Sequence, residues 1–413
     1  MLRREFLKTA TFAAAAPWLP SFSFHKNSDA LPKYAEMAAR LKNAPSITAE
    51  DYAGRVARLQ ALMSERKVAG LFCEPTTNSF YLTGYQTDRS ERLIALFIPA
   101  QGKPLMICPA FEESRVRHEA GFEKIYIWEE HESPYALLGR ILGDLSLRTG
   151  TIAMEPTTRY FVVDAIGREV PQAKLINGES LCDSLRIRKS EKELGLMRLS
   201  LDATEACIRQ TWTQIKFGMK EQEVARLLSQ NYSAIGLSGG GLIQFGPSAA
   251  VPHGGPGGKP LEQDQIVLMD CGTEVKGYTS DITRTTVFGK PSKRHEEIWQ
   301  LVHQSQSAGI AAARPGVTCE SVDAAARQVI DEAGYGKYFT HRLGHGIGLE
   351  GHEAPYFARG NKTILQPGMT LTVEPGIYIP GEFGVRLEDD IVITENGCEL
   401  LTHRMLGIEP IGL

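Results

Sequence analysis

Apolar residues in the second half of the chain recur at helical spacing, in segments separated by glycine and by short alternating runs. Ser190 and Glu193 form a capping-box pattern, and the apolar stripe after it predicts a long helix that ends at Gly218. The same periodicity predicts three more helices, over about residues 221–234, 293–313 and 320–333. Each pair of helices is followed by sequence with the alternation of β-strands.

The first strand segment carries two acids in apolar, β-branched sequence. Residues 267–272 and 278–284 are predicted to form a hairpin, with Asp270 in one strand and Asp281 in the other. If the hairpin is centred on Val275-Lys276, the two aspartates oppose each other directly and share one face. Two carboxylates a few ångströms apart cost several kcal/mol unless a cation binds them or one takes up a proton.

A second pair of acids lies near the C-terminus. Residues 371–375 and 385–389 carry Glu374 and Glu388 and frame a loop rich in glycine and proline. Between the two pairs, residues 341–348 contain alternating glycines, which predict backbone packed closely against another segment. Four carboxylates with one or two imidazoles suit two divalent metal ions, and mostly oxygen ligands favour manganese, cobalt or zinc. The pattern predicts a dinuclear hydrolase site.

The order helix, helix, hairpin occurs twice, which predicts an approximate two-fold symmetry within one α+β domain over residues 190–413, with both acid pairs at its centre. Residues 51–185 instead alternate between helical and strand patterns and predict a smaller α/β domain. Residues 31–50 are predicted to form a linker with a short helix. A length of 413 residues agrees with two domains. The clearest elements of the smaller domain are a helix over 55–63 and strands over 70–73 and 93–98.

The acids and the glycine-rich histidine segment together resemble the metal ligands of the pita-bread metallopeptidases. Asp270 is followed by an Asp eleven residues on, His345 lies in Gly-His-Gly-Ile-Gly-Leu-Glu-Gly-His-Glu, Glu374 in Glu-Pro-Gly-Ile-Tyr, and Glu388 in Val-Arg-Leu-Glu-Asp-Asp. The resemblance is strong over residues 190–413 and weak over 50–185, where it implies a creatinase-type N-terminal domain. It favours the Xaa-Pro aminopeptidase and Xaa-Pro dipeptidase (prolidase) group. Creatinase, the metal-free relative, lacks the full ligand set.

The resemblance also implies a role for each ligand. Asp281 and Glu388 would bridge two ions, Asp270 would complete one of them, and His345 with Glu374 would complete the other. Metal binding lowers the pKa of water from 15.7 toward about 7, so that a hydroxide becomes available near neutral pH. Glu374 would in addition carry a proton to the leaving nitrogen.

Four further residues are expected to assist catalysis. His253 and His352 would orient the scissile carbonyl and stabilise the oxyanion, and His341 matches a third histidine of the same group. Arg386 shares a strand face with Glu388 and would either offset excess negative charge or hold a carbonyl or carboxylate of the substrate. Arg386 is the only nearby arginine that the motifs place.

The expected activity is hydrolysis of Xaa-Pro bonds, whose tertiary amide and fixed φ hinder ordinary proteases. Because no basic cluster is devoted to a free C-terminus, we expect removal of the first residue from Xaa-Pro peptides longer than two, with prolidase as the alternative. Two other classes are open: a binding module without activity, and a metal-free amidinohydrolase. Residues 78–85 resemble a segment that approaches an active site, often a neighbouring subunit's, although Phe80 and Tyr81 also suit a core. The resemblance implies a homo-oligomer, a dimer or tetramer.

Composition and the absence of certain motifs argue against several other classes of protein. The net charge of −4 gives no basic surface for nucleic acid. Seven cysteines without a Cys-x-x-Cys pair predict neither a disulfide framework nor a zinc ribbon. The glycine-rich run 236–258 lacks the ending of a phosphate-binding loop, and no Gly-x-Ser-x-Gly motif suggests a serine nucleophile.

The first residues of the chain suggest export. Arg3 and Arg4, followed by Phe6-Leu7-Lys8, resemble a twin-arginine signal, and residues 9–20 supply a weakly apolar stretch too short to span a membrane. Residues 1–30 are therefore predicted to hold the signal and the start of the linker. We expect the twin-arginine machinery as a partner and a periplasmic or other extracytoplasmic location. Because that machinery carries folded proteins, the metals could be loaded before export.

Overall fold

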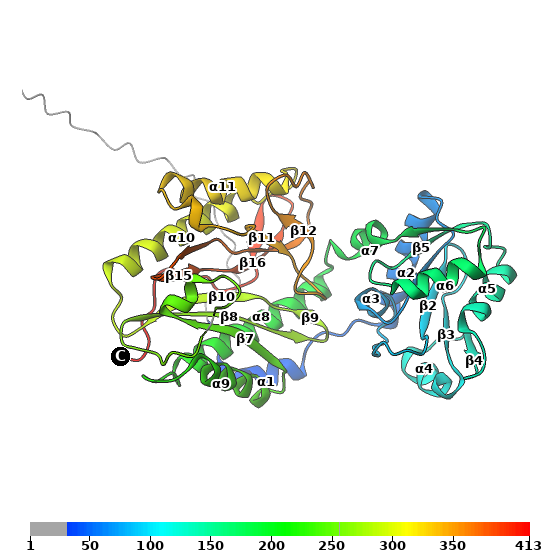
Figure 1. Cartoon of the computed structure of the whole chain (residues 1–413), viewed down its shortest axis with the longest axis horizontal. Helices are drawn as coiled ribbons and strands as arrows, with labels where there is room; N and C mark the ends of the chain where they lie inside the picture. Colours follow the sequence, from blue (N-terminus) through cyan, green and yellow to red (C-terminus); the bar gives the residue numbers. More distant parts are fainter. Residues whose placement is uncertain (1–30, 256) are drawn as a thin grey trace, which may run out of the picture.

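The structure is a computed structural model that describes residues 31–255 and 257–413, which form an N-terminal and a C-terminal domain (Figure 1). The predicted export signal, residues 1–30, lies outside the described residues. None of the described helices is both long and apolar enough to cross a membrane.

The N-terminal domain is a six-stranded mixed sheet with helices on both faces. The strand order is β4-β3-β2-β1-β5-β6; β2 is antiparallel to both neighbours and the other pairs are parallel. Leu71 and Cys73 face one apolar core and Phe72 faces the other, as alternation along a strand requires. Its elements are α2 (Ala49–Glu65), β1 (Gly70–Cys73), α3 (Thr77–Thr83), β2 (Ala95–Pro99), β3 (Leu105–Pro109), α4 (Glu113–Ala120), β4 (Ile125–Trp128), α5 (Pro134–Asp144), β5 (Thr151–Met154), α6 (Tyr160–Glu169), β6 (Lys174–Asn177) and α7 (Glu179–Arg186).

The short helix α1 (Tyr34–Lys42) packs on the C-terminal domain, although it precedes the N-terminal domain in sequence (Figure 1). The Tyr34 hydroxyl donates a hydrogen bond to the Asn231 carbonyl oxygen at 2.7 Å, and Met37 is fully buried in the core of the C-terminal domain. From α1 onward, the described chain therefore runs from the C-terminal domain into the N-terminal domain and returns through α7.

The C-terminal domain consists of two similar halves. Strands β7-β8-β10 of the first half and β11-β13-β16 of the second are each antiparallel, with α8 and α9 outside one set and α10 and α11 outside the other (Figure 1). The predicted α+β fold with an internal two-fold is confirmed, and both halves have more strands than the predicted hairpins. The first half comprises α8 (Glu191–Trp212), α9 (Glu221–Ala234), β7 (Gly239–Phe245), β8 (Gln265–Val275), β9 (Tyr278–Thr279) and β10 (Ile282–Phe288). The second comprises α10 (Lys293–Ala312), α11 (Cys319–Glu332), β11 (Gly344–Gly346), β12 (Glu353–Phe357), β13 (Thr370–Val373), β14 (Gly376–Ile379), β15 (Phe383–Arg386), β16 (Asp389–Ile393) and β17 (Cys398–Leu400).

The long helix α8 begins as predicted and ends earlier than predicted. Ser190 and Glu193 form a complete capping box. The helix stops at Trp212, and Gly218, at φ +83°, donates its backbone N–H to Leu261 at 2.9 Å. Gly218 therefore joins the helix to a separate segment and does not cap it.

The first hairpin is shifted from the predicted register. Asp270 pairs with Thr283, and the turn lies at Lys276-Gly277, both at positive φ. Such a turn needs positive φ at both positions, which the predicted centre would have imposed on the β-branched Val275. The backbone N–H of Ser280 bonds to Thr273, so the next residue, Asp281, faces Gly272 and the prediction of direct opposition to Asp270 was wrong.

The second hairpin has more residues in β-strands than predicted. Val373 pairs with Asp389 and Gly376 with Arg386, so Glu374 and Glu388 face each other between the two ladders. The predicted loop between these segments is largely the two strands β14 and β15.

Candidate metal centre

Five side chains from both halves of the C-terminal domain converge at its centre. Asp270 comes from β8, Asp281 from the link between β9 and β10, His345 from β11, and Glu374 and Glu388 from the two sides of the second hairpin. Their ligand atoms form overlapping groups within 4.8 Å, one with Asp270, Asp281 and Glu388, another with His345, Glu374 and Glu388. The five residues line a cavity of about 730 Å³. The structure thus brings together all the residues that the sequence nominates as ligands.

His345 is oriented as a metal ligand would be. Its Nδ1 lies 3.0 Å from the Gly346 carbonyl oxygen, which can only accept, so Nδ1 carries the proton and Nε2 has a free lone pair. Nε2 lies 3.4 Å from Glu374 Oε1 and 3.9 Å from Asp281 Oδ2. Ligands about 2.0–2.2 Å from a shared ion stand roughly this far apart. Burial lowers the pKa of His345 to about 3, which keeps the ring neutral.

The carboxylates are not balanced by the protein alone. Burial, with repulsion from Glu388 and Asp270, raises the pKa of Asp281 well above its usual range. Burial, together with repulsion from Asp270, raises the pKa of Glu388 to about 8. Burial, together with repulsion from Glu388, also raises the pKa of Glu374 well above its usual range. Divalent cations would remove this repulsion, so the donor set fits the two-metal site that the sequence predicts.

Arg386 and Thr283 hold two of the carboxylates. Arg386 Nη2 lies 2.6 Å from Asp270 Oδ2, and its Nε donates to Thr283 Oγ1 at 3.1 Å. The Thr283 hydroxyl in turn donates to Glu388 Oε2 at 2.7 Å. Of the two roles expected for Arg386, its contacts support charge compensation, because Asp270 already occupies the guanidinium.

His341 lines the same cavity with both ring nitrogens engaged. Nδ1 donates to the Arg342 carbonyl oxygen at 2.7 Å, so Nε2 accepts from the Tyr378 hydroxyl at 2.8 Å. Tyr378 also accepts a hydrogen bond from Arg386 Nη1 at 2.9 Å. Burial lowers the pKa of His341 to about 4. His341 is therefore a neutral acceptor that fixes Tyr378.

The other two expected histidines lie at the open side of the cavity. The His352 ring centroid is 4.0 Å from that of His345, and His352 has an atom within the 4.8 Å group of Asp281 and His345. His253 is exposed in the loop after β7 and lines the cavity; Arg386 Nη1 bonds to the carbonyl oxygen of the preceding Pro252 at 3.2 Å.

Sequence reasoning did not nominate two residues that line this cavity, Leu242 and Arg342, or Tyr378, which contacts two of the lining residues. Tyr378 links His341 to Arg386, Leu242 of β7 supplies an apolar wall, and Arg342 contributes a second guanidinium. Arg342 stands next to His341 in the motif that identified the site, so its position in the chain was the available signal. The expectation that Arg386 is the only nearby arginine was wrong.

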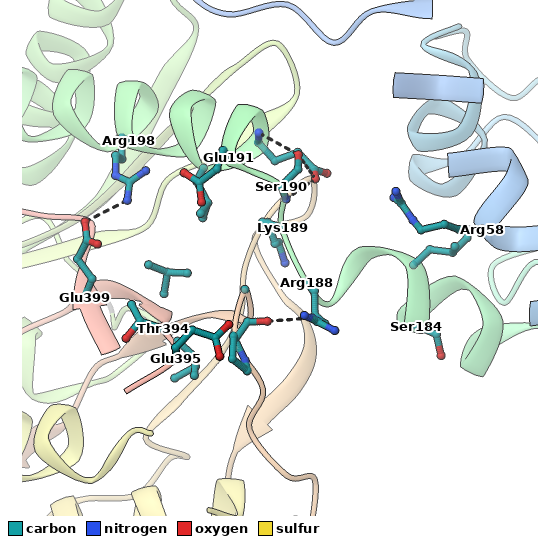
Figure 2. A pocket seen from close by; sticks show the side chains of 17 residues that line it. Arg58, Ser184, Arg188, Lys189, Ser190, Glu191, Arg198, Thr394, Glu395 and Glu399 are labelled. Atoms are coloured by element: carbon teal, nitrogen blue, oxygen red, sulfur yellow. Dashed lines mark hydrogen bonds and ion pairs between the residues drawn. The ribbon is translucent and has the colours of Figure 1, made fainter. Parts of the chain in front are cut away.

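A second cavity, of about 640 Å³, lies where the two domains meet and holds none of the candidate ligands (Figure 2). Arg198 Nη2 bonds to Glu399 Oε1 at 3.0 Å, and Arg188 Nε bonds to the Pro367 carbonyl oxygen at 2.8 Å. Its lining includes four basic and four acidic side chains, so neither sign of charge predominates.

Comparison with known proteins agrees with this geometry. Residues 195–395 match the metallopeptidase family M24, and residues 55–188 match the creatinase/prolidase N-terminal domain. An uncharacterized peptidase of Staphylococcus aureus is 36% identical over 332 residues, which cover 79% of this chain and 92% of the relative. A prolidase from Thermococcus sibiricus superposes with a TM-score of 0.81 at 29% identity, covering 89% of this chain and 100% of that one. An X-Pro aminopeptidase from Thermotoga maritima superposes with a TM-score of 0.77 at 30% identity, covering 86% of this chain and 99% of that one.

The fold and the converging carboxylates define a metallopeptidase. The chain belongs to the metallopeptidase family M24, with a creatinase-type N-terminal domain before the pita-bread catalytic domain.

Proposed function

We propose that this protein hydrolyses Xaa-Pro bonds with two divalent metal ions, manganese in the first instance and cobalt or zinc as alternatives. The observation that carries the proposal is the convergence of Asp270, Asp281, His345, Glu374 and Glu388 in one cavity. The prolidase and the X-Pro aminopeptidase with similar structures support the choice of an Xaa-Pro bond.

Each residue has a task in this reaction. The metal ions, when bound, polarise the scissile carbonyl and lower the pKa of a water molecule. Glu374, whose pKa is raised by burial and by Glu388, takes up a proton and delivers it to the leaving proline nitrogen. His352 and His253 donate hydrogen bonds to the carbonyl oxygen as charge develops on it. Arg386 holds Asp270 in place.

The proposed activity has two forms. The sequence favours an aminopeptidase, which removes the first residue from peptides longer than two. The second candidate is a dipeptidase, which accepts only Xaa-Pro with a free carboxylate. Arg342 favours the dipeptidase, because it supplies the cation that the motifs did not place.

A substrate panel tests the proposal. The purified, chelated full chain is reconstituted with manganese, cobalt or zinc and given Ala-Pro, Ala-Pro-Pro-Ala and, as a control, Ala-Ala-Ala-Ala. We expect metal-dependent cleavage after alanine in at least one proline peptide. Activity that survives chelation would favour the amidinohydrolase, and metal binding without cleavage would favour a binding module.

We also propose export by the twin-arginine route to an extracytoplasmic location, on the basis of Arg3 and Arg4. Exchanging both for lysine should retain the protein in the cytoplasm with its peptidase activity intact, because both residues precede the N-terminal and the C-terminal domain in sequence and are not among the residues of the site. Unchanged fractionation of this double variant would contradict the proposal. We propose in addition that the protein is a homo-oligomer, a dimer or tetramer, as its resemblance to the Xaa-Pro peptidases implies. Light scattering of the purified protein tests this.

A further inference from the structure

Arg342 is the arginine of the cavity that forms no direct ion pair with a described carboxylate, although its charge acts on the nearby Glu374. It lies at the wall shared with His352 and Glu374, while the other arginine of the cavity, Arg386, is paired with Asp270. Within the described part of the chain, no acid lies within ion-pair distance of the Arg342 guanidinium. A permanent positive charge without a direct ion-pair partner, next to a substrate cavity, attracts an anionic group of the substrate.

The guanidinium is held in a fixed orientation. Its central carbon lies 4.4 Å from the centroid of the Tyr356 ring, and Nη2 lies 3.4 Å from His352 Nδ1. Stacking on an aromatic face leaves the N–H groups at the edge of the guanidinium plane available. A planar fork of this kind matches a carboxylate, which it can bind with two parallel hydrogen bonds.

The contact between Arg342 and His352 indicates which carboxylate of a substrate can reach Arg342. In a dipeptide the scissile carbonyl carbon and the terminal carboxyl carbon are separated by one nitrogen and one Cα, so they lie less than about 4 Å apart. His352, which we assign to the scissile carbonyl, and Arg342 are in direct contact. We propose that Arg342 binds the C-terminal carboxylate of an Xaa-Pro dipeptide and so makes the protein prefer dipeptides; this inference rests on the proposed Xaa-Pro activity.

A longer peptide places a neutral amide carbonyl where the dipeptide has its carboxylate. That carbonyl accepts a hydrogen bond from Arg342 without neutralising its charge, and the remaining chain has to pass the guanidinium. The preference for dipeptides thus follows from charge at one position, without any need for the cavity to be closed.

Arg342 has a second possible effect, through its neighbour. Because a guanidinium only donates, its contact with His352 Nδ1 favours the tautomer in which Nε2 carries the proton. Loss of that effect would slow all substrates alike, whereas loss of carboxylate binding would slow only those with a free carboxylate. The two roles are therefore separated by a substrate that lacks the carboxylate.

The experiment compares Ala-Pro with Ala-prolinamide in the manganese-loaded full chain. We expect the wild type to prefer Ala-Pro by about 10- to 100-fold in kcat/KM, the range of a charge-assisted hydrogen bond. Arg342→Gln should lower kcat/KM for Ala-Pro by the same factor, mainly through KM, and change that for Ala-prolinamide less than about threefold. Arg342→Lys should keep part of the preference. Arg359→Gln, an exposed arginine of the same region outside the cavity, is the matched control and should behave as wild type.

Two outcomes would overturn the assignment of Arg342: an equal loss on both substrates in Arg342→Gln, or a wild type that cleaves the amide as well as the acid. In either case cleavage of Ala-Pro, Ala-Pro-Pro-Ala or Ala-prolinamide would leave the Xaa-Pro function standing. If the metal-loaded wild type cleaves none of the three, the proposed function and the inference fall together.

Discussion

Asp281 and Glu388 are the residues on which the two-metal proposal depends most. Asp281 belongs both to the group with Asp270 and to the group with His345, and Glu388 also belongs to two groups. Asp281→Asn or Glu388→Gln keeps the shape and removes the charge, so each should lose most bound metal and lower activity by at least about 100-fold. Metal analysis of the purified variants measures this. Glu395→Gln, exposed in the second cavity, is the control. Two ions retained per chain in either variant would contradict the bridging roles.

The raised pKa of Glu388 makes a prediction about pH. In the folded, metal-free chain this carboxyl keeps its proton up to about pH 8, whereas the unfolded chain loses it near 4.5. The folded chain therefore binds more protons between these values, and its stability falls as pH rises through this window. We expect the melting temperature of the chelated protein to fall by roughly 2–5 °C from pH 5 to pH 8, and manganese to remove the fall by binding the deprotonated carboxylates. A chelated protein that grows more stable over this range would contradict the sign.

At the scale of the elements, alternation in the sequence was enough to find which acids share a face. It did not fix the register, because the register depends on which two residues can adopt positive φ in the turn. Lys276 and Gly277 do so, which moves Asp281 opposite Gly272. The strand register is shifted by two residues, and side chains along a strand alternate with a period of two. Asp281 therefore still lies on the same face as Asp270, and the two aspartates still meet at the site.

The strand β7 shows why other parts could not be predicted. Glycines at its start carry no hydrophobic pattern, and such a run suggests a loop. Gly241 is required instead by packing: a Cβ there would lie 2.5 Å from the Asp270 carbonyl oxygen. Close contact between distant segments is a tertiary property, and so is the pairing of Arg386 with Asp270, which left Arg342 as the cavity arginine without a direct ion pair to a described carboxylate.

The loop between β11 and β12, which carries His352, is anchored mainly by one buried acid, Glu353, next to a more exposed pair of Glu350 with Arg186. Glu353 follows His352 directly, is 8% exposed, and pairs through its two oxygens with Arg186 of α7 and with Lys189. Glu353→Gln would leave these buried cations poorly paired, which costs about 3–5 kcal/mol. We therefore expect a clear loss of stability in denaturant unfolding, and a lower kcat because His352 is less well placed.

The control for Glu353 is Lys362→Gln, which breaks an exposed pair with Glu320 in the same half of the domain. Exposed pairs contribute little, so this variant should unfold as the wild type does. If Glu353→Gln were equally neutral, the buried pairs would not be what holds the His352 loop.

At the scale of the whole molecule, Arg55 of α2 ties the two domains together next to the metal centre. Arg55 is 4% exposed. Its guanidinium bonds within its own domain to the Tyr81 carbonyl oxygen at 2.8 Å, and across the interface to Glu193 Oε1 at 3.0 Å and the Tyr278 hydroxyl at 2.9 Å. Glu193 caps α8, and Tyr278 lies three residues before Asp281. Movement of the N-terminal domain is thus coupled to the hairpin that carries a proposed ligand.

Removing the Arg55 charge should uncouple the domains. Arg55→Met leaves Glu193 buried without its cation, a loss of about 3–5 kcal/mol, so calorimetry should resolve two unfolding transitions where the wild type has one. The metal affinity should also fall, because the hairpin around Asp281 loses its contact with the N-terminal domain. Lys192→Gln is the matched control: Lys192 pairs with Asp51 across the same interface, 2.6 Å apart, but in solvent. It should leave both readouts unchanged, since exposed pairs add little. A single transition at the wild-type temperature in Arg55→Met would mean that apolar contact, and not this buried ion pair, joins the two domains.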